Sequence, residues 1–525
     1  MTDRRVIDGR VPRIVVVGFG PVAARLVDEL LPAVRAGRLA LTVLGEEAHA
    51  AYNRVLVADL GVGRTTVDAM MLAEPAELAA AGVDVRLRTA VRHVDRARKL
   101  VRLEDGTAVG YDRLVFATGA RAVVPNLHGL NPDPHTDPGL PAGVIALRDV
   151  ADAAVLRRAV TGGHRIVVLG GGILGLEAAL AAADEGAEVT IVHHGPHTLA
   201  RSIDAGAGHV LSATLRARGV RIVADARSTA VTLRASGDGT ASFAALKLDD
   251  GQEIPGDLLL LSCGVRPRIE LAEGAGLATD RGILVDHGLA AHHDEDVFAI
   301  GDCAEIRCLA AGCAECAAAP SPSGLIGPGW RQAEHLAARL LRPVSSVQAL
   351  PAEPAPVMLL KARGVDVAAA GDVTAGPFDD ACLDGGPLRV SQWADPEHGR
   401  YVKMVTRGGV LAGLVCVGLP RTAAELVLLY ERGAELPADR SVLLRLDGPD
   451  RPPAGAATAG AADPARTVCR CAGVGGAAID AAVADGCASV ADVAARTRAG
   501  TGCGGCHGDI RARIEAHFQP AVAPR

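Results

Sequence analysis

The chain carries RIVVVGFGPVA at residues 13–23 and a closely similar stretch, RIVVLGGGILG, at residues 165–175. In each stretch the branched apolar residues predict a buried parallel strand, and the alanine- and leucine-rich residues behind it predict a helix. The glycines between strand and helix have the spacing G-x-G-x-x-A in the first stretch and G-x-G-x-x-G in the second. This order of strand, glycine turn and helix is the fingerprint of a dinucleotide-binding domain. Finding it twice predicts two such domains in one chain.

The similarity between the two regions continues beyond the fingerprints. Each region has a second strand, then a β-rich stretch with a hairpin signal, then an apolar strand that ends in glycine and is followed by an arginine. In the first region these are residues 41–44, 104–106, 114–119 and Arg121; in the second they are residues 188–192, 249–251, 258–264 and Arg266. Residues 297–302 resemble a strand end that returns to the first domain. We therefore expect the second unit to be inserted into the first.

The composition is that of a globular protein and excludes some classes of partner. The chain has 525 residues, of which 49% are hydrophobic and 22% are charged, as in soluble globular proteins. A net charge of -7 and 2% aromatic residues provide neither a broad basic surface nor stacking platforms for nucleic acid. No apolar run approaches the roughly 20 residues that span a bilayer, and no secretory segment follows Met1. We expect no nucleic-acid or membrane partner, and twelve cysteines without a signal peptide indicate the reducing cytoplasm.

The first fingerprint predicts how a dinucleotide would be held. Gly18 allows the tight turn, Gly20 lets the backbone approach a pyrophosphate, and Ala23 permits close packing of helix on strand. The phosphates would lie at the helix N-terminus, where backbone N–H groups and the helix dipole favour an anion. An acidic residue after the second strand is expected to bind the ribose hydroxyls, and Glu46 or Glu47 is in that position.

Three further segments resemble those of known proteins. Residues 51–55 (Ala-Tyr-Asn-Arg-Val), 117–120 (Ala-Thr-Gly-Ala) and 301–304 (Gly-Asp-Cys-Ala) resemble the flavin-contacting segments of flavoprotein reductases with two dinucleotide domains. Residues 52–55 are most similar to the FAD module of NAD(P)H-dependent nitrite reductase large subunits and of assimilatory nitrate reductase electron-transfer subunits. The resemblance extends from residue 13 to about residue 445.

This resemblance implies that the first unit binds FAD. It implies that Thr118 and Gly119 belong to the flavin site and that Asp302 contacts the ribityl chain. Arg54 is implied to lie beside the flavin, where it is a candidate catalytic residue. One departure is residues 57–58, Val-Ala, where such proteins commonly have a polar serine after the arginine. This departure concerns details of the pocket rather than the cofactor.

The second fingerprint, Gly170, Gly172 and Gly175, predicts a nicotinamide nucleotide site. By resemblance, Glu177 on the following helix faces the contact between nicotinamide and flavin and is the second candidate catalytic residue. The residue after the second strand distinguishes the two nucleotides, since a carboxylate favours NAD and an arginine favours NADP. His193 is at this position and is a candidate for cofactor binding, although a solvated histidine at a strand end is an equally good interpretation. The choice between NADH and NADPH stays open, and the resemblance favours NADH.

Disulfide reductases of this architecture carry redox-active cysteines near the first dinucleotide unit. This chain has no cysteine between Met1 and Ser262, which excludes dithiol exchange by that route. Electrons must therefore leave the flavin in another way.

Four cysteines near the C-terminus provide that route. They form a C-x-C and a C-x-x-C pair, separated by stretches at 477–485 and 490–498 that predict helices. Four thiolates suit either zinc or an iron–sulfur cluster. The spacing resembles the [2Fe–2S] domain of bacterioferritin-associated ferredoxin, which also occurs in nitrite and nitrate reductase flavosubunits. The resemblance implies a [2Fe–2S] cluster, with a structural zinc site as the alternative; the ligands would be Cys469, Cys471, Cys503 and Cys506.

A second group of cysteines follows the predicted flavin segment. It has the spacing C-x4-C-x4-C-x2-C and comprises Cys303, Cys308, Cys313 and Cys316. Cys303 belongs to the flavin-site motif, so three cysteines are additional. They could hold another metal or cluster, or they could be free thiols in an exposed loop.

We therefore expect an α/β protein with two Rossmann-like dinucleotide-binding domains, one inserted in the other, a small α+β domain and a small C-terminal helical iron–sulfur domain. The expected bounds are 11–150 with 285–345 for the FAD-binding domain, 151–284 for the NAD(P)H-binding domain, 350–445 for the α+β domain, 446–466 for a flexible linker and 467–518 for the [2Fe–2S]-binding domain. The linker is rich in proline, alanine and glycine.

The expected function is electron transfer from NAD(P)H through FAD to the [2Fe–2S] cluster. The chain ends soon after the cluster module, with no sequence for the sirohaem region of full nitrite reductase large subunits. We therefore expect an electron-transfer subunit that serves a separate nitrate or nitrite reductase catalytic subunit. The alternatives are a stand-alone ferredoxin-type reductase or NAD(P)H oxidase, and the flavin subunit of an amino-acid or opine dehydrogenase.

Overall fold

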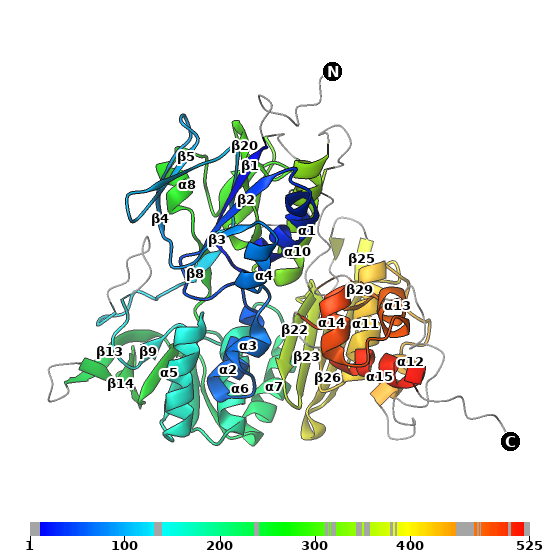
Figure 1. Ribbon diagram of the computed structural model, residues 1–525. Coiled ribbons are helices and arrows are strands. Elements are labelled where there is room, and N and C mark those ends of the chain that lie inside the picture. The colour runs from blue at the N-terminus through cyan, green and yellow to red at the C-terminus, as the bar shows by residue number, and fades with distance from the viewer. Residues whose placement is uncertain are drawn as a thin grey trace.

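The computed structural model describes residues 11–130, 139–235, 241–309, 313, 316, 322–342, 349–350, 357–378, 382–383, 386–447, 467–469, 472, 474–501 and 506–518. It confirms the α/β fold class, with two dinucleotide-binding units, an antiparallel sheet with helices, and a small helical region near the C-terminus (Figure 1). Along this described part of the chain, no helix is both long and apolar enough to cross a membrane.

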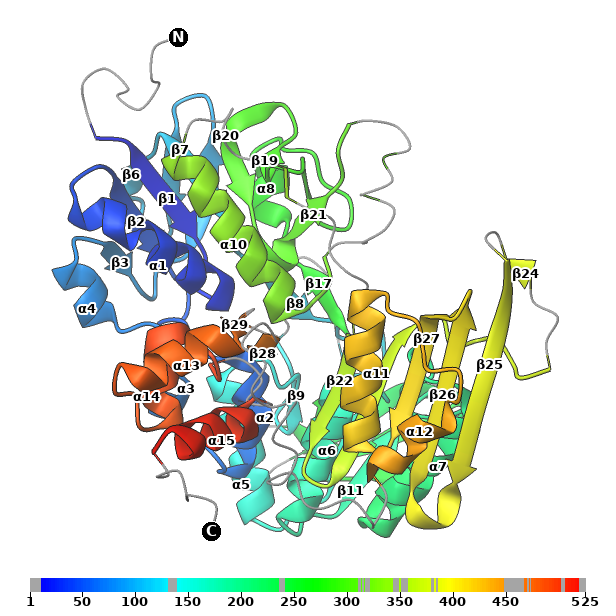
Figure 2. The ribbon, with the colours of Figure 1, turned by 90° about the vertical axis from the view of Figure 1, so that its right-hand side faces the viewer.

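The first sheet is built around β1 (Arg13–Val17), whose four apolar residues are buried. β1 pairs in parallel with β2 and β7, and the strand order is β21-β18-β19-β20-β7-β1-β2-β3. The other strands are β2 (Ala40–Leu44), β3 (Asp84–Arg86), β7 (Arg113–Phe116), β18 (Ile283–Val285), β19 (Ala290–Ala291), β20 (Asp294–Ala299) and β21 (Ala304–Ile306). α1 (Pro21–Arg35) and α10 (Ile326–Leu341) lie side by side over this sheet (Figure 2). The chain thus returns after residue 283 to the sheet that it begins at residue 13, as an inserted second unit requires.

The second sheet repeats the central part of the first. Its order β12-β11-β10-β16-β9 is parallel throughout and matches β3-β2-β1-β7-β20 strand for strand. Its strands are β9 (Val144–Ile145), β10 (Ile166–Leu169), β11 (Val189–Val192), β12 (Val220–Val223) and β16 (Leu258–Leu261). The helices of this unit are α5 (Val150–Thr161), α6 (Ile173–Asp184) and α7 (Ala205–Ala217). The predicted duplication is therefore confirmed in three dimensions.

Each unit also has a three-stranded antiparallel sheet where the sequence signals a hairpin. The strands are β4 (Val91–Asp95), β5 (Leu100–Leu103) and β6 (Ala108–Gly110) in the first unit, and β13 (Ser228–Ala235), β14 (Ala241–Leu248) and β15 (Glu253–Pro255) in the second. Gly106 and Gly251 lie in the β5–β6 and β14–β15 turns with φ of +82° and +88°, a backbone conformation that favours glycine.

A short strand pair links the two units. β8 (Ala120–Ala122) and β17 (Val265–Pro267) run antiparallel, with Arg121 opposite Arg266. β8 follows Gly119 at the end of the first parallel sheet, and β17 follows Gly264 at the end of the second. The pair therefore holds the carboxyl ends of the two sheets close together, which is where dinucleotides bind in such folds.

The antiparallel sheet of the third region packs on the second unit. Its order is β22-β23-β27-β26-β25-β24, formed by β22 (Val357–Ala362), β23 (Val365–Gly371), β24 (Cys382–Leu383), β25 (Gly386–Asp395), β26 (Arg400–Arg407) and β27 (Val410–Val417). Along β23, Val367 and Ala369 join the core of the second unit, whereas Ala368 and Ala370 face α11 (Pro420–Arg432). This alternation covers both faces of the sheet.

A buried polar contact strengthens this packing. The Tyr401 hydroxyl donates to Asp204 Oδ2 at 2.6 Å, and Lys403 Nζ donates to the same oxygen at 3.1 Å. The Lys403 side chain is only 3% exposed, so its charge depends on this carboxylate.

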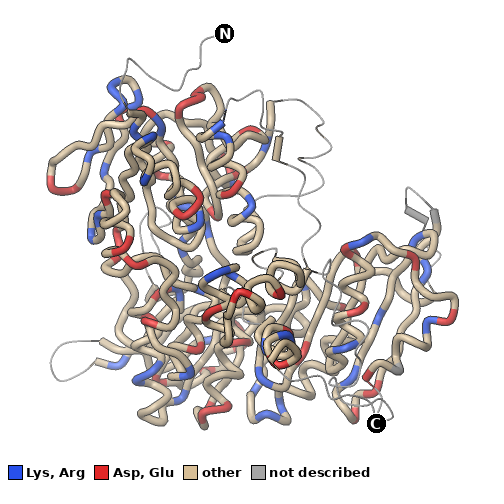
Figure 3. The backbone as a smooth tube through the Cα atoms, turned by 45° about the vertical axis from the view of Figure 1, so that its right-hand side comes forward, with Lys and Arg blue, Asp and Glu red and all other residues tan. Residues whose placement is uncertain are grey.

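The C-terminal region, residues 467–518, is named here the cysteine module. It contains β28 (Thr467–Cys469), β29 (Val474–Gly475), α13 (Gly476–Ala484), α14 (Val490–Thr497) and α15 (His507–Phe518). The two predicted helices are confirmed to within one residue at each end, and α14 begins with a capping box formed by Ser489 and Asp492. Ile479, Val493 and Ile510 form its buried core. Most of the linker expected at 446–466 lies outside the described residues. Basic and acidic residues are interspersed along the described backbone (Figure 3).

Candidate cofactor site

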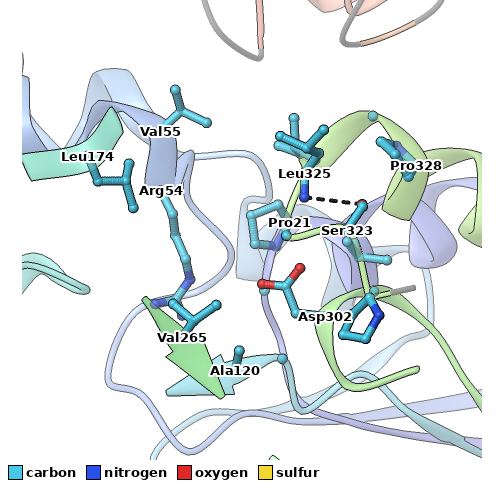
Figure 4. Close-up of a pocket in the computed structure, with 18 of the residues that line it drawn as sticks. Pro21, Arg54, Val55, Ala120, Leu174, Val265, Asp302, Ser323, Leu325 and Pro328 are labelled. Carbon is cyan, nitrogen blue, oxygen red and sulfur yellow. Dashed lines mark hydrogen bonds between the residues drawn. The ribbon is translucent and has the colours of Figure 1, made fainter. Parts of the chain in front are cut away.

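One large cavity, of about 1840 Å³, lies where the two dinucleotide-binding units, the β22–β23 and α11 part of the third region and the cysteine module meet. Its walls include both glycine turns, the Arg54 segment, the Thr118–Gly119 turn and Asp302. In Figure 4, Leu174, Val265 and Leu325 add apolar surface from three separate parts of the chain. A space of this size between two carboxyl sheet ends suits two dinucleotides that must meet.

The two glycine turns have the same geometry. A Cβ on Gly18, at φ +102°, would lie 2.2 Å from the oxygen of Ala117, and a Cβ on Gly170, at φ +123°, would lie 2.1 Å from the oxygen of Ser262. Only glycine fits either position. Each turn thus packs against the end of the neighbouring parallel strand, as the fingerprint predicts.

The second glycine of each fingerprint opens on the cavity. Gly20 and Gly172 are the N-caps of α1 and α6, with no side-chain cap and no acidic residue in the first helical turn. A Cβ at either position would meet no atom within 4 Å. Backbone N–H groups at these two helix starts therefore face space that suits a phosphate group.

The third fingerprint position serves packing in both units. Ala23 is fully buried, and a Cβ on Gly175 would lie 2.9 Å from the oxygen of Gly170. The first unit has alanine and the second glycine at this position because α6 approaches the turn at Gly170 more closely than α1 approaches its own turn.

The two acidic residues after β2 have different surroundings, and both line the cavity. Glu46 is exposed and pairs with Arg268 at 3.3 Å. Glu47 accepts a hydrogen bond from the Tyr52 hydroxyl at 2.8 Å and pairs with Arg54. Burial disfavours the Glu47 anion, but the Arg54 charge and the two hydrogen bonds outweigh it and hold the pKa of Glu47 below its usual value.

Arg54 projects into the cavity toward Val265 and Ala120 (Figure 4). Its guanidinium donates to the backbone oxygen of Arg148 at 3.2 Å and stacks over the Tyr52 ring at 5.0 Å from the centroid. The Glu47 carboxylate, the Arg148 carbonyl and the ring fix its position. Arg54 therefore presents a held positive charge on the cavity wall.

Asp302 lies on the opposite wall in η2 (Gly301–Cys303). It pairs with Arg148 at 3.3 Å, and Gly301 N donates to the side chain of Gln332 on α10 at 2.7 Å. Burial and the neighbouring charge of Arg54 lower the pKa of Arg148, although Asp302 opposes that shift. Sequence reasoning missed Arg148 and Gln332, since neither belongs to a spaced motif.

The two remaining residues of the first unit lie in its closing turn. Thr118 donates its hydroxyl to the oxygen of Arg268 at 2.8 Å. Gly119 has φ +70°, and a Cβ there would meet no atom within 4 Å. Both residues line the cavity, so the structure brings the whole predicted flavin set together.

The second unit contributes Glu177 but not His193 to the cavity wall. Glu177 lines the cavity from α6, beyond Gly172. His193 is buried and packs beneath the turn, where a Cβ on Gly171 would lie 3.1 Å from its ring. Burial, with the nearby His194, lowers the pKa of His193 and favours the neutral ring.

The cysteine module is docked on the same cavity. Cys469 at the end of β28 and Cys506 before α15 are both buried, and both line the cavity. The predicted ligands Cys471 and Cys503 lie outside the described residues. In the view of Figure 2, α13, α14 and α15 lie in front of α2 (Val57–Val62) and α3 (Val67–Met70).

Polar contacts between described residues join the module to the first unit. The buried side-chain amide of Asn53 donates to the oxygen of Thr501 at 2.7 Å. Arg498, at the C-cap of α14, pairs with Asp28 on α1. The first contact connects the residue before Arg54 with a residue two positions before Cys503. No spacing or composition in the sequence indicates this docking.

Comparison with known proteins agrees with this arrangement. A family model described as pyridine nucleotide-disulphide oxidoreductase matches residues 12–321, and one described as BFD-like [2Fe-2S] binding domain matches residues 467–516. The chain is 30% identical over 512 residues to the NAD(P)H nitrite reductase large subunit of Klebsiella oxytoca, covering 96% of this chain and 49% of that protein. It is 25% identical over 500 residues to the assimilatory nitrate reductase electron transfer subunit of Bacillus subtilis, covering 94% and 58%.

The chain thus spans about half the length of the curated relatives it matches. Among solved structures, it is similar to putidaredoxin reductase in its covalent complex with putidaredoxin, with a TM-score of 0.66, 23% identity and coverage of 83% of this chain and 96% of the other. It is also similar to an NAD-dependent persulfide reductase from A. fulgidus, with a TM-score of 0.65, 21% identity and coverage of 81% and 77%. At this level of identity these structures support the fold.

Proposed function

The chain belongs to the pyridine nucleotide-disulphide oxidoreductase family, and on that premise we propose that it passes electrons from NAD(P)H through FAD to a [2Fe–2S] cluster and on to a partner reductase. One observation carries this proposal: a single cavity is lined by the first glycine fingerprint, by Gly172 of the second, and by Cys469 and Cys506. A nicotinamide donor, a flavin and a thiolate-held acceptor can therefore meet in one space.

The first unit fits FAD. The close approach at Gly18 and the open backbone at Gly20 leave room for a pyrophosphate at the start of α1. Arg54 stands opposite Asp302 across the remaining space (Figure 4). We assign FAD binding to Gly18, Gly20, Ala23, Glu46, Arg54, Thr118, Gly119 and Asp302.

The second unit fits a nicotinamide nucleotide for the same reason. Gly170, Gly172 and Gly175 form the turn, and Glu177 reaches the cavity where the units face each other. His193 would support this turn from beneath, through its packing on Gly171. Since it presents neither a carboxylate nor a guanidinium, both NADH and NADPH remain substrates to test.

When bound, FAD supplies the conversion between a two-electron hydride donor and a one-electron acceptor. Arg54 offers a fixed positive charge that stabilises negative charge developing beside it, because Glu47 and the Arg148 carbonyl already hold its guanidinium in place. Glu177 orients the nucleotide from α6. Apolar side chains such as Leu174 and Leu325, which are exposed on the cavity wall, would exclude water from the space between the two cofactors once both are bound.

The cysteine module fits an acceptor at the cavity. Cys469 and Cys506 are buried and face the cavity from two sides of the module's core, and we assign the cluster to these two with Cys471 and Cys503. Thiolate ligands that line the flavin cavity need no separate carrier between the two sites. The contact between Asn53 and Thr501 keeps the C-x-x-C segment beside the Arg54 segment.

We further propose the domain bounds 11–150 with 285–345, 151–284, 350–445 and 467–518, joined by a linker at 446–466. The partner would be the catalytic subunit of an assimilatory nitrate or nitrite reductase, because the relatives with both modules carry those names. Cytoplasmic location is part of the same proposal.

Anaerobic mixing of the purified protein with NADH or NADPH tests the function. We expect flavin absorbance to bleach first and cluster absorbance second, and a nitrate or nitrite reductase catalytic subunit to reoxidise both. Bleaching by amino acids or opines but not by NAD(P)H would favour a dehydrogenase subunit instead. Rapid turnover with oxygen alone would favour an oxidase. Colourless protein, or protein with zinc in place of iron at the C-terminal cysteines, would contradict the proposal.

A further inference from the structure

A second ligand set lies beside the flavin segment, at the edge of the first sheet. β18 and β21 are parallel neighbours, with Val285 opposite Ile306. His287 and Cys308 each follow two residues after this matched pair. Because parallel strands end at the same edge of a sheet, the register brings these two side chains together.

Two more cysteines complete the group. Cys313 Sγ and Cys316 Sγ each lie 3.4 Å from His287 Nε2. Cys316 Sγ lies 3.6 Å from Cys308 Sγ. All four ligand atoms are within 4.8 Å of one another. The residues come from two strand ends and one C-x-x-C pair, far from the C-terminal cysteines in sequence.

The membership differs from the four-cysteine group that the spacing suggests. Cys303 is fully buried, and its thiol points to the backbone oxygens of Ile300 and Phe116 at 3.3 and 3.5 Å. His287 takes the fourth place. The sequence could not show this, because His287 precedes the cysteines by more than twenty residues and joins them only through the β18–β21 register.

The distances match the edges of a tetrahedron around one ion. With zinc–sulfur bonds of about 2.3 Å and zinc–nitrogen bonds of about 2.0–2.1 Å, the sulfur–sulfur edge is about 3.8 Å and the sulfur–nitrogen edge about 3.6 Å. The observed separations of 3.6 and 3.4 Å are close to both. Ligands shared among several irons would lie farther apart, since opposite ligands belong to different ions. A disulfide needs sulfurs at about 2.05 Å, well short of the separation here.

We propose that His287, Cys308, Cys313 and Cys316 bind one zinc ion. Three thiolates and one imidazole form a closed tetrahedral set, which is the composition of structural zinc sites. The Cys308 backbone N–H donates to Cys316 Sγ at 3.3 Å, as expected for a sulfur that carries negative charge.

The position of the ion gives it a structural consequence. His287 and Cys316 line the cofactor cavity, as do Ser323, Leu325 and Pro328 before and within the first turn of α10. Zinc would tie the chain that leaves the Asp302 segment to the turn after β18, and so fix this wall of the cavity. Because zinc is redox-inactive, it would do so without taking electrons from the cofactors.

Metal analysis of the full-length protein tests the proposal. We expect about one zinc per chain in addition to iron. In the double variant Cys313→Ser/Cys316→Ser, zinc should fall by about tenfold or more while iron stays unchanged. Cys263→Ser is the matched control, because this cysteine lies outside both groups, and it should keep the zinc.

A further variant separates the two thiolate sites. Cys469→Ser/Cys506→Ser should lose iron and keep zinc. X-ray absorption at the zinc edge of this variant should give three sulfurs at about 2.3 Å and one nitrogen at about 2.0–2.1 Å. This readout does not depend on the Cys313 variant folding. Three results would each overturn the proposal. They are loss of zinc in the Cys469→Ser/Cys506→Ser variant, additional iron in place of zinc, and the absence of zinc from protein produced in zinc-supplemented medium.

Discussion

Replacing Arg498 by alanine is expected to loosen the cysteine module from the cofactor cavity. The Arg498 guanidinium pairs with Asp28 on α1, and the two side chains are 28% and 32% exposed. Burial, with the nearby charge of Arg25, lowers the pKa of Arg498 to about 10. The guanidinium has therefore been partly removed from water, and its Asp28 partner is what makes that position favourable.

The structure bounds the size of the effect. An exposed ion pair contributes about 0.2–1 kcal/mol, and removing one partner of a fully buried pair costs about 3–5 kcal/mol. Because about a third of each Arg498 and Asp28 side chain is exposed, we expect about 1–2 kcal/mol, which lowers the docking equilibrium constant by about 5–30-fold. Combining Arg498→Ala with Asp28→Ala should cost less than the sum of the single changes.

Anaerobic stopped-flow mixing with the nicotinamide donor measures the consequence. Bleaching of the cluster should slow by up to about 30-fold when docking limits it. Bleaching of the flavin should keep its rate, because Arg498 is not among the described residues that line the cavity. Salt should produce a similar slowing in the unaltered protein, because it screens the pair.

Arg496→Ala is the matched control. Arg496 lies on the same helix but pairs with Asp485 inside the module, and these side chains are 59% and 57% exposed. The cluster phase should not change. An equal loss in both arginine variants, or a normal cluster phase in Arg498→Ala with full iron content, would refute the docking argument.

Three further predictions concern the fold and the flavin. Gly18→Ala should reduce bound flavin, measured by absorbance, by about tenfold or more, because its Cβ would lie 2.2 Å from a carbonyl oxygen at φ +102°. Lys403→Met leaves Asp204 without its buried cation, and urea titration should show a loss of about 2–4 kcal/mol in the free energy of unfolding. Hydrogen bonds from Arg165 lower the pKa of Asp257 from 3.8 to about 2. The resulting stabilisation is present above pH 4 and lost as the pH falls from about 4 to about 2, so Asp257→Asn should flatten the dependence of stability on pH in that window.

Two of these changes have a matched control in the chain. Gly37→Ala adds a side chain at φ +64° where no atom lies within 4 Å, so flavin content should not change. Lys247→Met removes an ion pair to Glu253 in which both side chains are about half exposed, and it should cost less than about 1 kcal/mol. Flavin retained by Gly18→Ala, or equal losses in the two lysine variants, would contradict the reasoning. A pH dependence unchanged by Asp257→Asn would remove Asp257 as its source.

The features of the fold and the site that can be predicted from the sequence are those that depend on the spacing of neighbouring residues. The glycine turns at Gly18 and Gly170 can be predicted because a positive φ and a nearby carbonyl oxygen allow only glycine at these positions. The helices of the cysteine module can be predicted from the periodicity of their apolar residues and, for α14, from the N-cap residue Ser489. The repetition of the same elements in both dinucleotide-binding units strengthens the fold prediction, because the same order of elements along the chain produces the same strand order in each sheet.

The parts that the sequence does not predict depend on contacts between distant residues. Arg148 reaches Asp302 across 154 positions, and Asn53 reaches Thr501 across 448. Neither pair has a characteristic spacing or composition. His193 illustrates the opposite case, because its position after β11 suggests a cofactor contact, but its side chain turns beneath Gly171. Strand ends define where a residue is, and packing decides which way it faces.

The docking also bears on how electrons could leave the protein. The contacts between module and first unit include one hydrogen bond and one partly exposed ion pair, which together contribute about 1–3 kcal/mol to docking. While it is docked, Cys469 and Cys506 face the cavity rather than solvent. A partner that takes electrons from the cluster would therefore either approach the outer face of the module or bind it after release, and weakening the Arg498 pair should slow cluster reduction while favouring the second route.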